Sequence, residues 1–222
     1  MNIAIFGNGR MGQLISKIAI QRGHSIITTS NSKKPATSCD LTNVDVAIDF
    51  SLPKVAFDNI SHAIKHKTPV ISGTTDWLDK LEVIKKECLE NNGAFLHASN
   101  FSLGMNIFFE LNKTLAKLMR DKKYTPSIDE THHIDKLDAP SGTALTLDNQ
   151  IKNILNQEIK ITSKRMPNEI GTHKINYSSQ IDNIEMIHTS KSRDGFALGA
   201  LIAAEWIIDK KGVFSMKDLL NL

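Results

Sequence analysis

The chain has 222 residues, enough for one large domain or two small ones with an ordinary hydrophobic core. Hydrophobic residues make up 41% of it and charged residues 23%, and the net charge is only +3, without a basic stripe or a nucleic-acid motif. These values argue against a nucleic-acid partner. The two cysteines, Cys39 and Cys88, are far apart, and no apolar run approaches a signal peptide or a membrane span. We therefore expect a cytoplasmic protein with no membrane partner.

Strands and helices alternate over the first hundred residues. Apolar runs and helical spacings predict strands at residues 2–6, 25–29, 44–50, 69–72 and 94–98, and helices at residues 13–22, 53–67 and 78–91. Residues 30–42 are polar and are expected to form a loop. Short connections between alternating strands and helices predict an α/β fold with a parallel, doubly wound sheet.

The pattern changes after residue 102. We expect helices at residues 105–120 and 143–155 and strands at residues 127–132, 159–163, 173–178 and 184–189, followed by helices at 196–208 and 214–222. Mixed helices and strands with polar links predict a second, smaller α+β unit. The last helices are expected to pack back on the first unit.

A glycine-rich turn follows the first strand and precedes the first helix. It has the form G-x-G-x-x-G and consists of Gly7, Asn8, Gly9, Arg10, Met11 and Gly12. In this context the first glycine permits a tight turn, the second admits a pyrophosphate and the third lets helix and strand approach closely. The motif predicts dinucleotide binding, and the alternative is a plain structural turn.

The second strand lacks the acidic residue that usually holds the ribose 2′-hydroxyl. Lys33 and Lys34 follow it, either as solvated loop residues or as attractors of a 2′-phosphate. Two further turns at the carboxyl ends of strands are expected to reach the nicotinamide and its ribose, unless they only end their strands. Their residues are Gly73, Thr74, Thr75, Ala98, Ser99, Asn100 and Phe101.

Residues 132–143 combine two imidazoles, an ammonium group and a Ser-Gly-Thr turn that opens a helix. Imidazole moves protons near neutral pH, and a helix start offers unpaired N–H groups to an anion. The segment therefore suits the reduction of a small, multiply charged acid. A buried core segment would leave these groups unpaired at high cost. A metal site would use His132, His133, Asp135 and Asp138, which have no recognised ligand spacing.

These motifs together resemble the 4-hydroxy-tetrahydrodipicolinate reductase (dihydrodipicolinate reductase) family over nearly the whole chain. The resemblance rests on the glycine turn, Asp49-Phe50-Ser51, Gly73-Thr74-Thr75, Asn100-Phe101-Ser102, residues 130–143, and Ser192-Arg193 with Phe196-Ala197. Residues 130–143 are its most specific part.

The resemblance implies a Rossmann-like dinucleotide-binding domain over residues 1–102, a substrate-binding and oligomerisation domain over 103–193, and C-terminal helices over 194–222 that pack back on the first domain. It implies hydride transfer from NADH or NADPH to a cyclic dicarboxylic acid, with loss of water, in lysine and diaminopimelate biosynthesis. It also implies a homotetramer. From the residue spacing we expect no metal. The stretch at residues 30–42 is shorter than in many members, which leaves the cofactor preference open.

By the same resemblance, His132 is the proton donor and Lys136 its catalytic partner. The residues implied to bind the substrate carboxylates are His133, Ser141, Gly142 and Thr143. Lys191 and Arg193 could add charge near the substrate or brace the junction of the domains. The alternatives are a non-catalytic sensor of a nicotinamide cofactor and a related dehydrogenase for another small acid.

Overall fold

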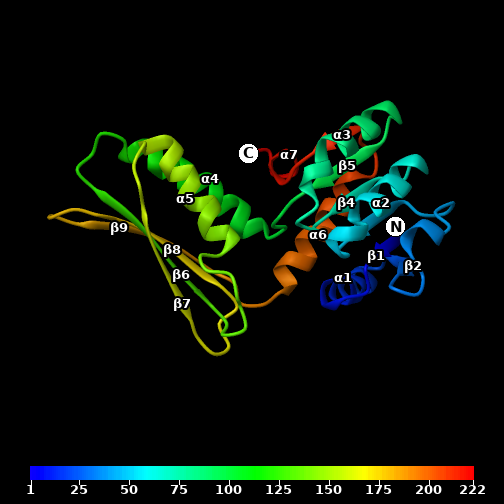
Figure 1. The fold of residues 1–222 in the computed structure, drawn as a ribbon, viewed down its shortest axis with the longest axis horizontal. Helices are drawn as coiled ribbons and strands as arrows, with labels where there is room; N and C mark the ends of the chain where they lie inside the picture. The colour runs from blue at the N-terminus through cyan, green and yellow to red at the C-terminus, as the bar shows by residue number, and fades with distance from the viewer. The chain divides into compact units, whose positions relative to one another are not determined.

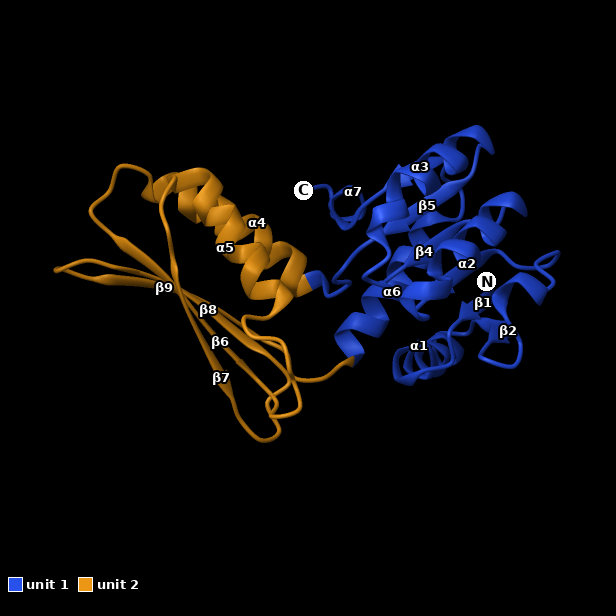
Figure 2. Cartoon of the chain, viewed as in Figure 1, with its two compact units in different colours: residues 1–103, 194–222 blue, residues 104–193 orange.

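The structure, a computed structural model, describes residues 1–222 and divides into two compact units (Figure 2). Unit 1 contains residues 1–103 and 194–222, and unit 2 contains residues 104–193. The chain therefore leaves unit 1, forms unit 2 without interruption, and returns to complete unit 1.

Unit 1 is built on a six-stranded parallel sheet (Figure 1). In spatial order its strands are β10 (Gly212–Phe214), β5 (Ala94–His97), β4 (Val70–Ser72), β3 (Val46–Asp49), β1 (Asn2–Phe6) and β2 (Ser25–Ser30). Its helices are α1 (Arg10–Gln21), α2 (Pro53–Lys65), α3 (Leu81–Glu90), α6 (Asp194–Ile207) and α7 (Met216–Leu220), with 3-10 turns at Ala36–Ser38 and Leu78–Lys80. The chain runs from β1 to β2 on one side and then to β3 on the other. The carboxyl ends of β1 and β3 thus form the switch point at which such sheets bind ligands.

The inner strands β1, β3, β4 and β5 of this sheet are buried on both faces, which explains their apolar runs. Ile3 and Ile5 pack with α1 and α6 on one face, and Ala4 and Phe6 pack with α2 on the other. Neighbouring residues of a strand point to opposite faces, so four residues of β1 contribute to two cores. The doubly wound sheet predicted from the sequence is confirmed.

The prediction of a helix throughout residues 214–222 is wrong at its start. Phe214 belongs to β10, which pairs in parallel with β5, and the helix begins only at Met216. Ser215 and Asp218 form a capping box that fixes this start. A three-residue strand is too short to show a periodicity, so the pairing with β5 is visible only in the structure.

Unit 2 has a four-stranded mixed sheet in the order β7 (Lys160–Arg165), β6 (Thr125–His132), β8 (Thr172–Ser178) and β9 (Asn183–Thr189). Helices α4 (Leu103–Met119) and α5 (Gly142–Leu155) lie along one face. Phe108 of α4 and Leu147 of α5 join Ile128, Ile175 and Tyr177 of the sheet in one buried cluster.

The other face of this sheet carries polar side chains and no helix of unit 2. Lys174 of β8 and Glu185 of β9 form an ion pair there, and Ile187 is 58% exposed. Strict alternation along β6 and β8 places Asp129 and Lys174 on this face, whereas the face under the helices holds both apolar side chains and the buried Glu130, His132 and His173. In both units, every helix is too short or too polar to cross a bilayer.

Candidate functional site

The glycine turn has the three conformational features that a dinucleotide site requires. Gly7 has φ +103°, and a Cβ there would lie 2.2 Å from the carbonyl oxygen of Phe50. A Cβ on Gly12 would lie 1.9 Å from the carbonyl oxygen of Gly7, so helix α1 packs tightly under the turn. Gly9 has open space instead, with nothing within 4 Å of a Cβ. The backbone is therefore bare where a pyrophosphate must approach the start of α1.

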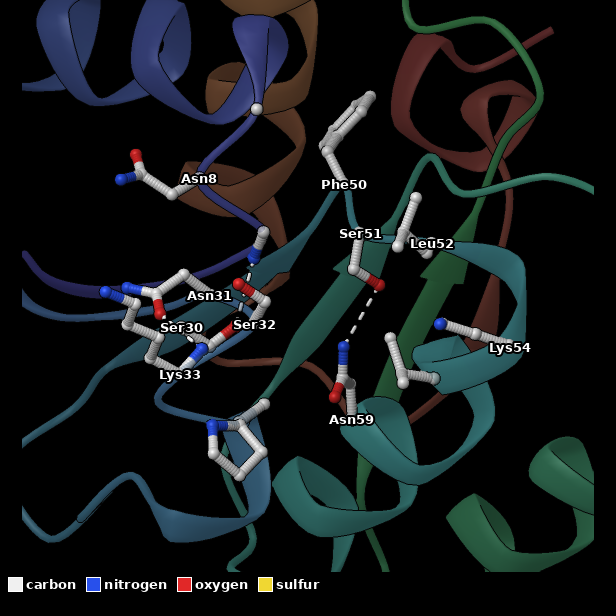
Figure 3. Close-up of a pocket in the computed structure, with 15 residues that line it drawn as sticks. Asn8, Ser30, Asn31, Ser32, Lys33, Phe50, Ser51, Leu52, Lys54 and Asn59 are labelled. Carbon is white, nitrogen blue, oxygen red and sulfur yellow. Dashed lines mark hydrogen bonds between the residues drawn. The ribbon is translucent and has the colours of Figure 1, made fainter.

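A cavity of about 780 Å³ opens beside this turn, at the carboxyl ends of β1, β2 and β3 (Figure 3). Two lysine side chains, Lys33 and Lys54, stand on opposite sides of it. The other residues that line it are Gly7, Asn8, Gly9, Ser30, Asn31, Ser32, Pro35, Ala36, Phe50, Ser51, Leu52, Val55 and Asn59. A bare glycine turn, a cavity of this size and two ammonium groups fit a dinucleotide with its phosphates.

Lys33 and Lys34, which the sequence does not distinguish, have different surroundings in the turn after β2. The side-chain oxygen of Asn31 accepts the N–H groups of Lys33 and Lys34, which fixes a tight turn. The ammonium of Lys34 donates to the Thr28 hydroxyl at 2.8 Å, away from the residues that line the cavity. Lys33 lines the cavity. Of the two, only Lys33 is placed to meet a ligand phosphate.

The other residues expected to bind the cofactor lie outside the residues that line this cavity and differ in burial. Arg10 and Met11 lie in the first turn of α1, Arg10 exposed and Met11 against the core. Thr75 and Ser99 are exposed, and Phe101 is buried with its ring 5.6 Å from that of Phe50. None of these lines the cavity, and the same holds for Gly12, Gly73, Thr74, Ala98 and Asn100.

Thr74 is tied to a buried carboxylate that organises the end of the sheet. Asp49 accepts hydrogen bonds from Ser51 at 2.6 Å, Thr74 at 2.7 Å, Ser72 at 3.0 Å and Asn59 at 3.1 Å. Burial raises the pKa of Asp49, while these four hydrogen bonds favour its charged form. Thr74 also accepts the N–H of Ser51, so its own proton points at the carboxylate. The network holds the turn after β4 against the cavity wall formed by residues 50–52.

In unit 2, alternation along β6 places Glu130 and His132 on the same face of the sheet. Their side chains form an ion pair between Glu130 Oε2 and His132 Nδ1. The ring of His132 is 10% exposed and lies edge-on to that of His173, with the centroids 5.0 Å apart. His132, the expected proton donor, and His133, an expected substrate-binding residue, thus differ in burial, since His133 is only half-buried.

The two buried histidines differ in protonation. Burial lowers the pKa of His173 to about 4, with a further contribution from His132, so it is neutral at pH 7. Burial also lowers the pKa of His132, but Glu130 acts in the opposite direction. Of this pair, His132 is the one whose ring forms an ion pair with Glu130, which favours its protonated form.

The loop after β6 holds Lys136 at the side of this cluster. Its ammonium pairs with Asp138 at 2.8 Å, and its carbonyl oxygen accepts from Arg165 Nε at 3.2 Å. Arg165 also donates to the Asp138 carbonyl oxygen at 2.6 Å. The backbone of the loop is thereby fixed while the Lys136 side chain remains partly exposed.

The start of α5 offers two free backbone donors. Ser141 is the N-cap: its hydroxyl accepts the Ala144 N–H at 3.2 Å, and its own N–H donates to Glu130. The N–H groups of Gly142 and Thr143 have no intrahelical partner, as in the first turn of any helix. A Cβ on Gly142 would meet nothing within 4 Å. Gly142 and Thr143 can therefore bind a carboxylate, whereas both groups of Ser141 are already engaged.

The residues considered for a metal site do not gather. Asp135 is exposed and Asp138 pairs with Lys136. A different group does gather: Glu130, His132 and His173 place ligand-type atoms within 4.8 Å of one another. The guanidinium of Arg165 already neutralises the carboxylate of Glu130, which disfavours a cation there.

Comparison with known families agrees with both units. Residues 1–101 match the family description "Dihydrodipicolinate reductase, N-terminus", and residues 104–220 match "Dihydrodipicolinate reductase, C-terminus". The chain belongs to the dihydrodipicolinate reductase family. The resemblance inferred from the sequence motifs is confirmed.

Relatives in this reductase family match the chain over its full length. A protein of Christiangramia forsetii named 4-hydroxy-tetrahydrodipicolinate reductase is 48% identical over 234 residues, covering 100% of this chain and 98% of its own. One of Thermosipho africanus with the same name is 35% identical over 223 residues, with 100% and 98% covered. A solved dihydrodipicolinate reductase from Paenisporosarcina sp. TG-14, with dipicolinate bound, shares the fold at a TM-score of 0.80 and 19% identity over 97% of each chain.

Several residues of this member of the reductase family escaped the sequence analysis. Glu130 could have been found, because residues two apart on a strand share a face. Arg165 and His173 reach the cluster only through the pairing of β7 and β8 with β6, and His173 pairs directly with Glu130. Lys54 carried no signal beyond its place at the start of α2. Lys191 and Arg193 are exposed.

Proposed function

We propose that the chain catalyses the NAD(P)H-dependent reduction of 4-hydroxy-tetrahydrodipicolinate to tetrahydrodipicolinate in lysine and diaminopimelate biosynthesis. The observation that carries the proposal is the full-length match to relatives of that name, the nearer of the two described being 48% identical. Reduction consumes one hydride and one proton and releases water. The chain must therefore bind a reduced dinucleotide, hold an acid and supply a proton.

Unit 1 carries the dinucleotide-binding function in this proposal. The start of α1, bare at Gly9, takes the pyrophosphate, and Lys33 and Lys54 add positive charge across the cavity. Gly7 and Gly12 keep the turn tight, and Asn8, Arg10 and Met11 continue it into the helix. The turns after β4 and β5, expected to approach the nicotinamide and ribose, are braced by the Asp49 network and by the packing of Phe101. When NAD(P)H is bound, its reduced nicotinamide supplies the hydride.

Unit 2 carries the acid-binding and proton-transfer functions. His132 donates the proton, because its imidazole is held beside an acid that supports its charged form. Lys136 supplies a fixed positive charge next to it, in competition with Asp138. Gly142 and Thr143 bind a substrate carboxylate through their backbone N–H groups, with His133 as a further polar contact. Ser141 contributes by capping α5.

We also propose that the enzyme accepts either NADH or NADPH. No carboxylate at the end of β2 rejects a 2′-phosphate, because Ser30 stands there and its hydroxyl accepts the Gly7 N–H. Lys33 adds attraction for that phosphate. Both cysteines are unpaired and buried, which fits the cytoplasm as the site of the reaction.

A homotetramer completes the proposal. The exposed face of the unit 2 sheet is covered by no helix of that unit, and Ile187 of the edge strand β9 is an exposed apolar side chain among its polar residues, at which another copy can pack. Four copies of a closed assembly would each bury such a face.

The direct test is an assay of NAD(P)H oxidation at 340 nm with substrate made freshly from pyruvate and aspartate semialdehyde. We expect oxidation only when both precursors and the condensing enzyme are present. A sensor protein would bind the cofactor without turnover, and a dehydrogenase for another acid would remain inactive here. No oxidation, with a known reductase active in the same mixture, would reject the proposed function.

A further inference from the structure

A buried carboxylate that the proposed function treats only as a charge beside His132 lies on β6 of unit 2. Glu130 has a side chain with 0% exposure. Its Oε2 pairs with Nδ1 of His132, and its Oε1 accepts from Arg165 at 3.1 and 3.2 Å and from the Ser141 N–H at 3.3 Å. A fully buried charge is costly unless fixed partners compensate it, and these three residues supply partners for both oxygens of Glu130.

We propose that Glu130 is a positioning residue for His132: it accepts the proton on Nδ1 and so leaves Nε2 as the nitrogen that donates to the substrate. The proposal deepens the proposed function and rests on the part of it that makes His132 the proton donor.

The backbone of β6 fixes the contact between the two side chains. Residues 130 and 132 are one strand repeat apart on the same face, so neither side chain needs a long reach to meet the other. An ionised carboxylate can only accept, which directs the Nδ1 proton toward it. The hydrogen bond at one ring nitrogen decides the state of the other. Nε2 is then free to carry the proton that is transferred.

Space beside Nε2 is kept open by a glycine. A Cβ on Gly171 would lie 3.0 Å from His132 Nε2, closer than a side chain normally packs. Any other residue at position 171 would crowd the nitrogen that this proposal makes the donor.

Arg165 joins the carboxylate to the loop that carries Lys136. Its guanidinium binds Oε1 of Glu130 and, with its remaining donors, the carbonyl oxygens of Lys136 and Asp138. Burial disfavours the charged form of Glu130. The Ser163 hydroxyl, His132 and Arg165 outweigh this effect, so the pKa of Glu130 lies below its usual value. Arg165 therefore contributes to keeping the acid ionised and ties it to the Lys136 loop.

Glu130 is the one acid among the charged groups that face His132. Burial lowers the pKa of His132, Lys136 and Arg165 lower it further, and only Glu130 raises it. His173 of β8 faces the ring as a neutral imidazole at pH 7, with a pKa of about 4. Removing the charge of Glu130 thus leaves only influences that favour the neutral ring.

The first test measures ring protonation in the full-length, cofactor-free protein by imidazole ¹⁵N shifts across a pH titration. The His132 signals are assigned by their loss in His132→Asn. We expect neutral His132 to carry its proton on Nδ1 in the wild type. In Glu130→Gln the amide NH₂ faces Nδ1, so the proton moves to Nε2 and the pKa of His132 falls by about one unit. Glu158→Gln is the matched control, since Glu158 is an exposed partner of Lys152 in the same unit.

The second test is the pH dependence of turnover in the same variants. A general acid works in its protonated form, so kcat/KM falls as pH rises through its pKa. In Glu130→Gln this fall moves to lower pH by about one unit and kcat at pH 7 drops about tenfold, with cofactor affinity unchanged. Glu158→Gln keeps the wild-type profile. If Glu130 served stability alone, Glu130→Gln would lower the unfolding temperature without moving the pH profile.

The outcomes separate this inference from the proposed function. A neutral wild-type ring protonated on Nε2 overturns the positioning role without any variant, even if Glu130→Gln fails to fold. A Glu130→Gln enzyme with the wild-type pH profile overturns it while inactive His132→Asn still supports the proposed function. A wild type without reductase activity rejects the proposed function, and the ¹⁵N shifts alone then decide how Glu130 orients the ring.

Discussion

His132 and Lys136 differ in what their removal should change. His132→Ala removes the proton donor, so we expect kcat to fall about 10²- to 10³-fold while the affinity for NADPH, measured by fluorescence titration, stays within about twofold. Lys136→Ala removes a positive charge beside the proton donor His132, so we expect mainly a higher KM for the substrate. Unchanged turnover in His132→Ala would remove that residue from its role, and normal kinetics in Lys136→Ala would do the same for the lysine.

Lys33 and Lys34 are neighbours in sequence with different surroundings, which makes them a matched pair. Lys33 lines the cavity, and Lys34 donates to Thr28 instead. We expect Lys33→Ala to raise the KM for NADPH about tenfold with little change for NADH, because a charge-assisted contact to the 2′-phosphate is lost. Lys34→Ala should leave the ratio of the two KM values unchanged. Equal effects of both substitutions would show that neither lysine reads the phosphate specifically.

At the scale of elements, Asp49 joins the ends of β3 and β4 to the middle of α2. All four partners donate to it. The side-chain nitrogen of Asn59 can act only as a donor. Asp49→Asn would turn an NH₂ group toward at least one of these donors. We expect a loss of about 2 kcal/mol in the free energy of unfolding, measured in urea at pH 7.

The control for this substitution is Asp79→Asn, the same chemical change at an exposed position in the 3-10 turn before α3. We expect its unfolding free energy to stay within about 0.5 kcal/mol of the wild type. Equal stability of the Asp49→Asn and Asp79→Asn variants would mean that the Asp49 network does not brace the carboxyl ends of the sheet.

At the scale of the whole molecule, the uncovered sheet face of unit 2 predicts self-association. We expect light scattering coupled to size exclusion to give four times the mass of the 24.7 kDa chain. Ile187→Asp places a charge on that face and should shift the mass toward smaller species. Ile181→Asp changes a residue that is 93% exposed between β8 and β9 and should keep the wild-type mass. A monomeric wild type at micromolar concentration would contradict the tetramer.

Some features of this protein follow from short stretches of sequence because their causes are local. The inner strands β1, β3, β4 and β5 of unit 1 are buried on both faces, so each appears as a short apolar run. The glycine turn is recognisable because each glycine answers a local steric need. The helix start at Ser141 is visible for the same reason, since capping involves residues three apart.

Other features arise only when distant segments meet. The three-residue strand β10 exists because β5 offers an edge for it. Arg165 and His173 reach His132 through the register of three strands, and Lys33 is distinguished from Lys34 by a single hydrogen bond to Thr28. Periodicity along a chain reports which face of an element is buried. It does not report which element covers that face, and the partners of a buried charge are therefore decided by the tertiary structure.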